Sequence, residues 1–175
     1  IVDEKIIKYS RKEDIMKKII LLLFAVFIIQ LPIAPATFAA GERLTVRETF
    51  TANAIPLVSN NMTYSLNFMP SGDIQLWSNG THTMIWHTNT RDLRISQLRI
   101  DQYSGRLKLM DWNNTPYWTS DNNAWANAWY GQGNVPVNLV GDLLILQDDG
   151  NLVLYNTKDL GRGWYPVWAS NTGGQ

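Results

Sequence analysis

The segment LLILQDDGNLVLY, residues 143–155, contains two apolar runs separated by a polar turn with a glycine. An Asp-Gly pair between alternating apolar residues predicts an antiparallel β-hairpin. Of five alternating positions, four carry hydrogen-bonding side chains and one, Val153, is apolar. The other four are Gln147, Asp149, Asn151 and Tyr155. A sugar needs this mixture, because each hydroxyl donates and accepts while the ring C–H face packs on an apolar wall. The segment therefore predicts a hairpin that carries a carbohydrate site.

The length of the turn decides which side chains share a face of the hairpin. A two-residue loop at Asp149-Gly150 would place Gln147 and Asn151 on opposite faces. An odd loop, such as residues 149–151, keeps Gln147 and Val153 on one face. A sugar site therefore favours an odd loop, or one continuous extended strand.

The same pattern occurs three times in the chain. The copies are YSLNFMPSGDIQLWSNGTHTMIWHTNT (64–90), SQLRIDQYSGRLKLMDWNNTPYWTSDN (96–122) and DLLILQDDGNLVLYNTKDLGRGWYPVWASNT (142–172). Each copy has an alternating strand, a glycine turn, a second alternating strand and a closing segment with a tryptophan: Trp86, Trp118 or Trp168. Repeats too small to bury a face alone must pack together. We predict an all-β domain in which these three rings are buried in a shared core.

One stretch interrupts the repeats between the second and third copies. Residues 122–138, NNAWANAWYGQGNVPVN, show no convincing helical period and are expected to form a longer loop. Trp125 and Trp129 in this stretch either form a second contact surface or pack over the end of a sheet.

The five alternating positions match the signature Q-x-D-x-N-x-V-x-Y in full, and in this respect the chain resembles the bulb-type (monocot) mannose-binding lectins. The resemblance implies a β-prism II fold, with three four-stranded antiparallel sheets in pseudo-threefold symmetry. It also implies binding of α-D-mannose. Asp149 and Asn151 would hold the 2-hydroxyl, Gln147 the 3-hydroxyl and Tyr155 the 4-hydroxyl, while Val153 would lie against ring carbons.

The other two repeats lack this signature. The positions that align with it hold Met69, Ser71, Asp73, Gln75 and Trp77 in the first repeat, and Gln102, Ser104, Arg106, Lys108 and Met110 in the second. Lys108 would put a charge where the apolar face of a sugar would lie. We therefore expect one working site among three. The chain also departs from the plant lectins in having no cysteine, so that the fold must be held by its core.

The start of the chain has the features of a secretory signal. Residues 1–15 precede Met16 and are interpreted as an over-extended gene start, residues 16–39 as a signal peptide, and residues 40–175 as the mature lectin domain. A permanent membrane anchor is the alternative, but the uninterrupted apolar run of residues 19–29 is short for a span. A secreted protein with no membrane association in its mature form is expected.

The mature part predicts neither nucleic-acid binding nor a cofactor. It holds nine basic and eleven acidic residues, so no basic footprint is left. Asp142, Asp148 and Asp149 form no recognisable metal loop. The expected partners are mannose-containing glycans, and multivalent glycans would supply avidity. The ending VWASNTGGQ is compatible with a homodimer formed by strand exchange.

Three rival interpretations remain. A glycoside hydrolase could use the Asp148/Asp149 pair, but a solvated turn is a poor place for a general acid. A β-trefoil also has threefold symmetry, but it would show Gln-x-Trp near the end of each unit, where Trp86, Trp118 and Trp168 are instead followed by Thr/Ser-Asn/Asp turns. A lectin-like bacteriocin would use the same fold for killing, usually with two domains in tandem. Sequons at Asn61, Asn79 and Asn113 matter only in a eukaryotic secretory pathway.

Overall fold

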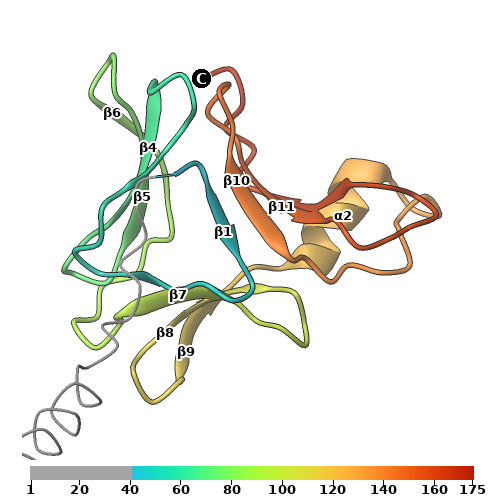
Figure 1. The fold of residues 1–175 in the computed structure, drawn as a ribbon, viewed down its shortest axis with the longest axis horizontal. Helices are drawn as coiled ribbons and strands as arrows, with labels where there is room; N and C mark the ends of the chain where they lie inside the picture. The colour runs from blue at the N-terminus through green and yellow to red at the C-terminus, as the bar shows by residue number, and fades with distance from the viewer. Residues whose placement is uncertain (1–40) are drawn as a thin grey trace, which may run out of the picture. The chain divides into compact units, whose positions relative to one another are not determined.

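The computed structural model describes residues 41–175, which form three four-stranded antiparallel sheets and one α-helix. Figure 1 shows the sheets arranged as the three sides of a triangle around a common axis. The predicted all-β architecture of three four-stranded sheets is therefore confirmed. The signal segment and the gene start lie outside the described residues.

Each repeat supplies three strands of one sheet. The first gives β4 (Tyr64–Phe68), β5 (Ile74–Ser78) and β6 (Thr83–His87); the second gives β7 (Gln97–Ile100), β8 (Leu107–Met110) and β9 (Pro116–Thr119); the third gives β10 (Leu143–Leu146), β11 (Leu152–Asn156) and β12 (Tyr165–Ala169). The fourth strands come from the segment that precedes the repeats: β1 (Arg43–Thr45), β2 (Phe50–Thr51) and β3 (Leu57–Val58). They join the third, second and first sheet respectively. Residues 43–58 therefore link all three sheets.

The core is built from one ladder of apolar side chains across each sheet. In the third sheet, Leu44 pairs with Leu144, Leu144 with Leu154, and Leu154 with Trp168. The other sheets repeat this ladder as Phe50–Leu98–Leu109–Trp118 and Leu57–Leu66–Leu76–Trp86. Because side chains alternate along a strand, the inward-facing residues of each strand supply the core of the triangle.

The three tryptophans at the ends of these ladders contact one another edge to face, as the repeats predict. Their ring centroids lie 5.8–6.2 Å apart, a favourable geometry for aromatic pairs. Trp168 is 7% exposed, whereas Trp86 and Trp118 are only partly buried. The three rings therefore meet as expected, but only Trp168 is buried, while Trp86 and Trp118 pack partly buried against the core.

A polar motif after each tryptophan explains why the repeats end alike. The hydroxyl oxygens of Thr88, Ser120 and Ser170, two residues after each tryptophan, accept hydrogen bonds of 2.9–3.1 Å from the backbone N–H that follows each glycine turn by two residues. Two residues further on, Thr90, Asn122 and Thr172 donate to the carbonyl oxygens of the turn glycines. The closing segment of each repeat therefore fixes the turn of the same repeat.

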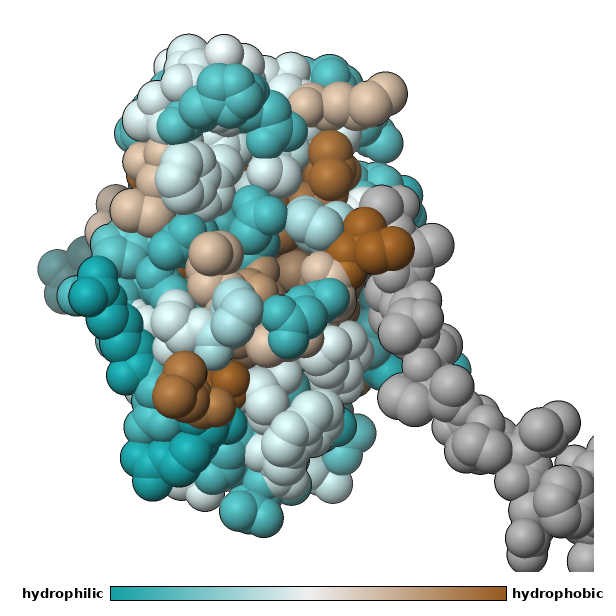
Figure 2. Space-filling model, turned by 90° about the vertical axis from the view of Figure 1, so that its left-hand side faces the viewer, coloured by the Kyte–Doolittle hydropathy of each residue, from teal (hydrophilic) through white to brown (hydrophobic). Residues whose placement is uncertain are grey.

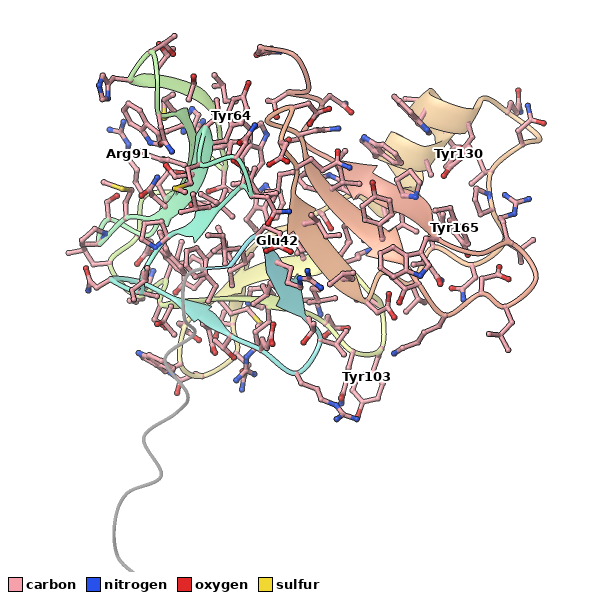
Figure 3. All side chains as sticks on the ribbon, turned by 45° about the horizontal axis from the view of Figure 1, so that its top comes forward. Glu42, Tyr64, Arg91, Tyr103, Tyr130 and Tyr165 are labelled. Atoms are coloured by element: carbon pink, nitrogen blue, oxygen red, sulfur yellow. The ribbon has the colours of Figure 1, made fainter. Side chains whose placement is uncertain are left out.

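The stretch expected to be a loop contains the helix α2, Asn122–Tyr130. Asp121 caps its N-terminus, because the carboxylate accepts from Ala124 N at 3.0 Å. The helix is held against β12 by the Tyr130 hydroxyl, which donates to the Pro166 carbonyl at 2.8 Å. Figure 3 shows Tyr130 on the helix and Tyr165 on the neighbouring strand. The helix was not predicted because it is short and its fixed position depends on packing against the sheet.

The outer surface of the domain is mixed in character. Over the first sheet, hydrophobic residues lie in separate patches among hydrophilic ones (Figure 2). Within residues 41–175, no helix has the length and apolar character needed to cross a membrane.

Candidate functional site

The signature residues lie on the hairpin of β10 and β11. Ile145 pairs with Val153, and Gln147 N donates to Asn151 O at 2.9 Å. Residues 148–150 therefore form a three-residue loop, and Gln147, Asn151 and Val153 share one face. The parity agrees with the expected odd loop, although the loop lies one residue earlier than residues 149–151. The face is the outer one, because Leu154 and Leu144 point into the core.

The tip of this hairpin is braced by the first repeat. Asn61 donates from its backbone N–H to Asp148 Oδ1 and from its side chain to Asp148 O, at 2.8 and 2.9 Å. Gly150, at φ +88°, lies so close to Tyr64 that an added Cβ would meet the ring carbon Cε1 at 2.6 Å. Contacts from 87 residues away therefore fix the loop that carries Asp149, which no local pattern could have shown.

Asn151 and Asp149 each keep one polar group for a ligand. Asn151 Oδ1 accepts from Ser170 Oγ at 3.2 Å and from Thr172 N at 3.3 Å. These donors identify the amide oxygen, so Nδ2 is the outward atom, and no described residue bonds it. Asp149 Oδ1 accepts from Asn151 N at 2.9 Å, which leaves Oδ2 as an acceptor. The pair presents the donor and acceptor that one sugar hydroxyl needs.

Gln147 and Tyr155 are brought together by a hydrogen bond from Gln147 Nε2 to the tyrosine hydroxyl, 2.9 Å long. Burial raises the pKa of the Tyr155 phenol, as does the charge of Asp149, against the opposite effect of this hydrogen bond. The phenol therefore stays protonated at neutral pH and can donate to a ligand. Trp164, 63% exposed, lies beside it with ring centroids 6.3 Å apart.

Val153 is almost completely withdrawn from solvent. Its side chain is 3% exposed and belongs to the same buried cluster as Trp125, Ala126 and Ala169. Val153 pairs with Ala169 of β12 on the outer face, against which α2 packs. Little of the Val153 side chain is therefore exposed as an apolar wall.

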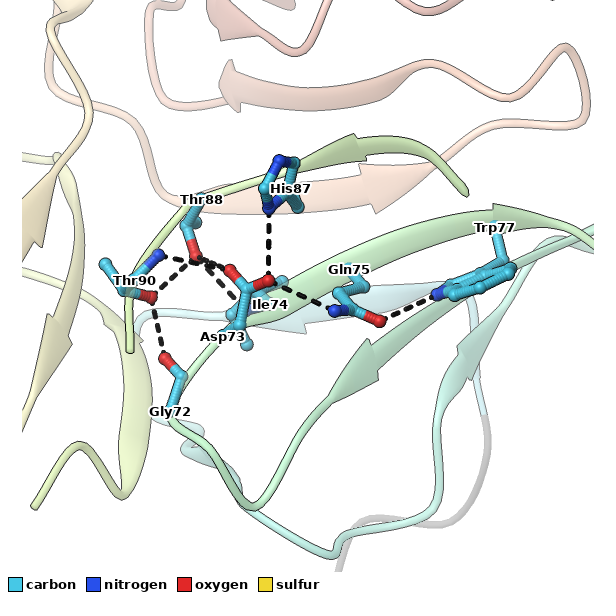
Figure 4. Close-up of polar contacts among 8 residues, drawn as sticks. All are labelled: Gly72, Asp73, Ile74, Gln75, Trp77, His87, Thr88 and Thr90. Carbon is cyan, nitrogen blue, oxygen red and sulfur yellow. Dashed lines mark hydrogen bonds and ion pairs between the residues drawn. The ribbon is translucent and has the colours of Figure 1, made fainter. Parts of the chain in front are cut away.

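The first repeat lacks the signature, and the residue that aligns with Asn151 is Asp73. Asp73 is buried and accepts from Thr88 Oγ1 and Thr90 N, as Asn151 does from its own repeat (Figure 4). Its second oxygen accepts from Gln75 Nε2 at 3.1 Å and lies 3.1 Å from His87 Nδ1. Burial opposes the charge, but these hydrogen bonds outweigh it and hold the pKa of Asp73 below its ordinary value. Both carboxylate oxygens of Asp73 therefore contact side chains or backbone of the same repeat instead of facing a ligand.

In the second repeat, the position of Val153 holds a charged side chain that is paired within the same repeat. Lys108, at the position of Val153, forms an ion pair with Asp101 at 2.9 Å. The ammonium group therefore lies on the outer face of this sheet, where an apolar wall would be needed.

A cavity beside the third hairpin joins two signature residues to the helix. It is lined by Trp125, Ala128, Trp129, Asp149, Asn151, Asn171 and Gly173. From the sequence, Trp125 and Trp129 could form either a contact surface or packing over a sheet end. Asn171 and Gly173 were not predicted to belong to a site. Once the stretch is helical, the four-residue spacing in Trp-Ala-Asn-Ala-Trp places both rings on one face of the helix.

Comparisons with known proteins agree with this architecture. No family model and no curated protein matches the sequence. A lectin of Marasmius oreades has a similar structure, with 21% identity, a TM-score of 0.54, and coverage of 77% of this chain and 93% of the lectin. A monomeric monocot mannose-binding lectin from Gastrodia elata is 20% identical, with a TM-score of 0.53 and coverage of 75% and 96%. Residues 41–175 therefore have the β-prism II fold of the bulb-type lectins.

Proposed function

We propose that this protein is a lectin that binds mannose-containing glycans through the outer face of its third sheet. One observation carries the proposal: the three-residue loop at 148–150 puts Gln147 and Asn151 opposite each other, on the face that also holds Tyr155. Donors and acceptors from both strands then point toward the same region. The similar structure of a mannose-binding lectin supports the ligand class.

The available atoms suit a ring with neighbouring hydroxyls. Asn151 Nδ2 donates and Asp149 Oδ2 accepts at the tip, while the Tyr155 hydroxyl and Gln147 Oε1 serve further along the hairpin. By resemblance, the first pair takes the axial 2-hydroxyl of mannose, and Gln147 and Tyr155 take the 3- and 4-hydroxyls. An epimer would leave one of these groups unpaired, at a cost of roughly 1–3 kcal/mol, or about ten- to hundred-fold in affinity. The site would therefore prefer mannose to glucose or galactose.

We propose binding rather than catalysis. Asp148 and Asp149 are both exposed at the hairpin tip, and Asp148 already accepts from Asn61. A general acid needs a desolvated environment, which this tip does not provide. A secreted lectin of this kind would gain useful strength on glycans that engage several copies at once.

The test is a calorimetric titration of the purified protein with methyl α-D-mannoside, methyl α-D-glucoside and methyl α-D-galactoside. Asn151→Ala should abolish detectable binding, but it also removes the oxygen that Ser170 and Thr172 use. Asn151→Asp is the sharper variant, because Asp73 shows that the fold accepts a carboxylate at this position. It keeps the buried acceptor, replaces the outward donor with a charge near Asp149, and should therefore remove binding while the melting temperature changes little.

Met69→Ala and Lys108→Ala test the equivalent faces of the other two sheets and should leave the affinity unchanged. Asp149→Asn should weaken binding, since a charge-assisted hydrogen bond becomes neutral. Wild-type affinity in Asn151→Asp would show that the third hairpin does not hold the sugar. Equal affinities for all three glycosides would contradict selectivity for mannose.

A further inference from the structure

The helix α2 places an exposed aromatic ring beside the signature residues. Trp125, 9% exposed, is anchored by a 2.9 Å hydrogen bond from Nε1 to Asn171 Oδ1. Trp129 follows one helical turn later and stacks on Trp125, with centroids 5.5 Å apart and planes within 14°. Trp129 nevertheless remains 62% exposed. A buried, hydrogen-bonded ring thus holds an exposed ring in a fixed position.

This ring forms part of a cavity whose other wall is polar. Trp129 and Ala128 lie on the helical side, and Asp149, Asn151 and Asn171 lie on the other. The cavity measures about 510 Å³, within the roughly 300–1,000 Å³ typical of small-ligand sites. An aromatic face opposite amide and carboxylate groups is the combination that a pyranose ring requires, with C–H groups on the indole and hydroxyls on the polar wall.

The cavity is continuous with the proposed mannose site but is not identical to it. Asp149 and Asn151 belong to both, whereas the described lining does not include Gln147 or Tyr155. The helix that supplies Trp129 packs against β12, the strand next to Val153, and Val153 itself is 3% exposed. The insertion therefore supplies an exposed apolar ring at a place where Val153 offers little apolar surface.

We propose that Trp129, backed by Trp125, is the platform of a second sugar subsite, so that the protein recognises a mannose oligosaccharide rather than a single ring. This inference rests on the proposed function, because Asp149 and Asn151 hold the first ring. The next ring of the glycan packs its C–H face on Trp129. Its hydroxyls lie toward the polar wall that includes Asn171.

The experiment compares methyl α-D-mannoside with an α-linked mannotriose by calorimetry, on wild-type protein, Trp129→Ala and Trp129→Phe. Wild-type protein should bind the trisaccharide more tightly than the monosaccharide, by about three- to ten-fold for one aromatic contact. Trp129→Ala should lose this gain and leave monosaccharide affinity within about two-fold. Trp129→Phe should keep part of the gain, because a smaller ring remains. Trp112→Ala is the matched control: Trp112 is 69% exposed and lies beyond the second sheet's β8.

Tryptophan fluorescence gives a second readout. Mannotriose should change the emission of wild-type protein and of Trp112→Ala, and the change should be lost in Trp129→Ala. Wild-type affinity for mannotriose in Trp129→Ala would overturn the subsite while leaving the proposed function intact. A wild-type protein that binds no mannoside would overturn the proposed function and the subsite together. A change of oligomeric state in Trp129→Ala, with unchanged trisaccharide binding, would assign the ring to a contact between copies instead.

Discussion

Gln147 Nε2 donates a 2.9 Å hydrogen bond to the hydroxyl of Tyr155, eight residues away on the facing strand. The bond fixes which atoms of this pair remain for a ligand: the tyrosine proton, the glutamine oxygen and the second amide N–H of Gln147. It also orients two flexible side chains before any sugar arrives, which lowers the entropic cost of binding.

Tyr155→Phe should therefore weaken mannose binding by about ten-fold, because it removes one ligand contact and leaves the Gln147 amide without its partner. Calorimetry measures the affinity, and the melting temperature should change little. Tyr103→Phe, at a tyrosine that is 84% exposed on the second repeat, is the control and should behave as wild type. An unchanged affinity in Tyr155→Phe would remove this residue from the site.

Gly150→Ala should destabilise the domain more than Gly133→Ala. Both glycines have φ +88°, so both variants carry the strain of a left-handed backbone, about 1 kcal/mol. Only at Gly150 would the new Cβ meet the Tyr64 ring, at 2.6 Å, whereas nothing lies within 4 Å at Gly133. Urea denaturation should show an extra loss of about 1–3 kcal/mol for Gly150→Ala. Equal losses in the two variants would mean that Tyr64 moves aside freely.

Asp73 should make the stability of the domain depend on pH in the acid range. Its folded pKa is lowered from the ordinary 3.8. Its contribution is therefore complete above pH 3.8 and is lost as the pH falls through the lowered value. Asp73→Asn should be less stable than wild type by about 1–2 kcal/mol at neutral pH. This gap should narrow below about pH 4, as followed by denaturation at several pH values.

Asn151, the amide at the equivalent position, indicates that the fold accepts Asp73→Asn. A gap between the two proteins that stays constant from pH 7 to pH 2 would refute a charged, hydrogen-bonded Asp73.

Trp168→Phe should cost more stability than Trp86→Phe. The three rings of the central cluster contact one another, but Trp168 is 7% exposed and Trp86 is only partly buried. Removing the larger ring leaves a cavity where packing is tighter, with an expected loss of about 2–3 kcal/mol for Trp168→Phe and about half of that for Trp86→Phe. Urea denaturation measures both. A larger loss for Trp86→Phe would show that the exposure of each ring does not predict its contribution to stability.

The repeat, the three glycine turns and the hairpins could be predicted from the sequence, because each follows from a local period of two and from the conformational freedom of glycine at positions such as Gly150. The sequence also located the outward polar face of the third hairpin, since one odd loop decides the faces for the whole strand pair. It did not reveal strands of two or three residues such as β2 and β1, whose pairing depends on the sheets that they join.

The surroundings of these elements depend on tertiary contacts. Helix α2 keeps a fixed place because Trp125 and Tyr130 bond to residues 46 and 36 positions away. The Asn151 amide is oriented by Ser170 and Thr172, and the hairpin tip by Asn61 and Tyr64. Such contacts join residues distant in the chain. Their energy depends on which surfaces meet, and a pattern read along the sequence does not contain that information.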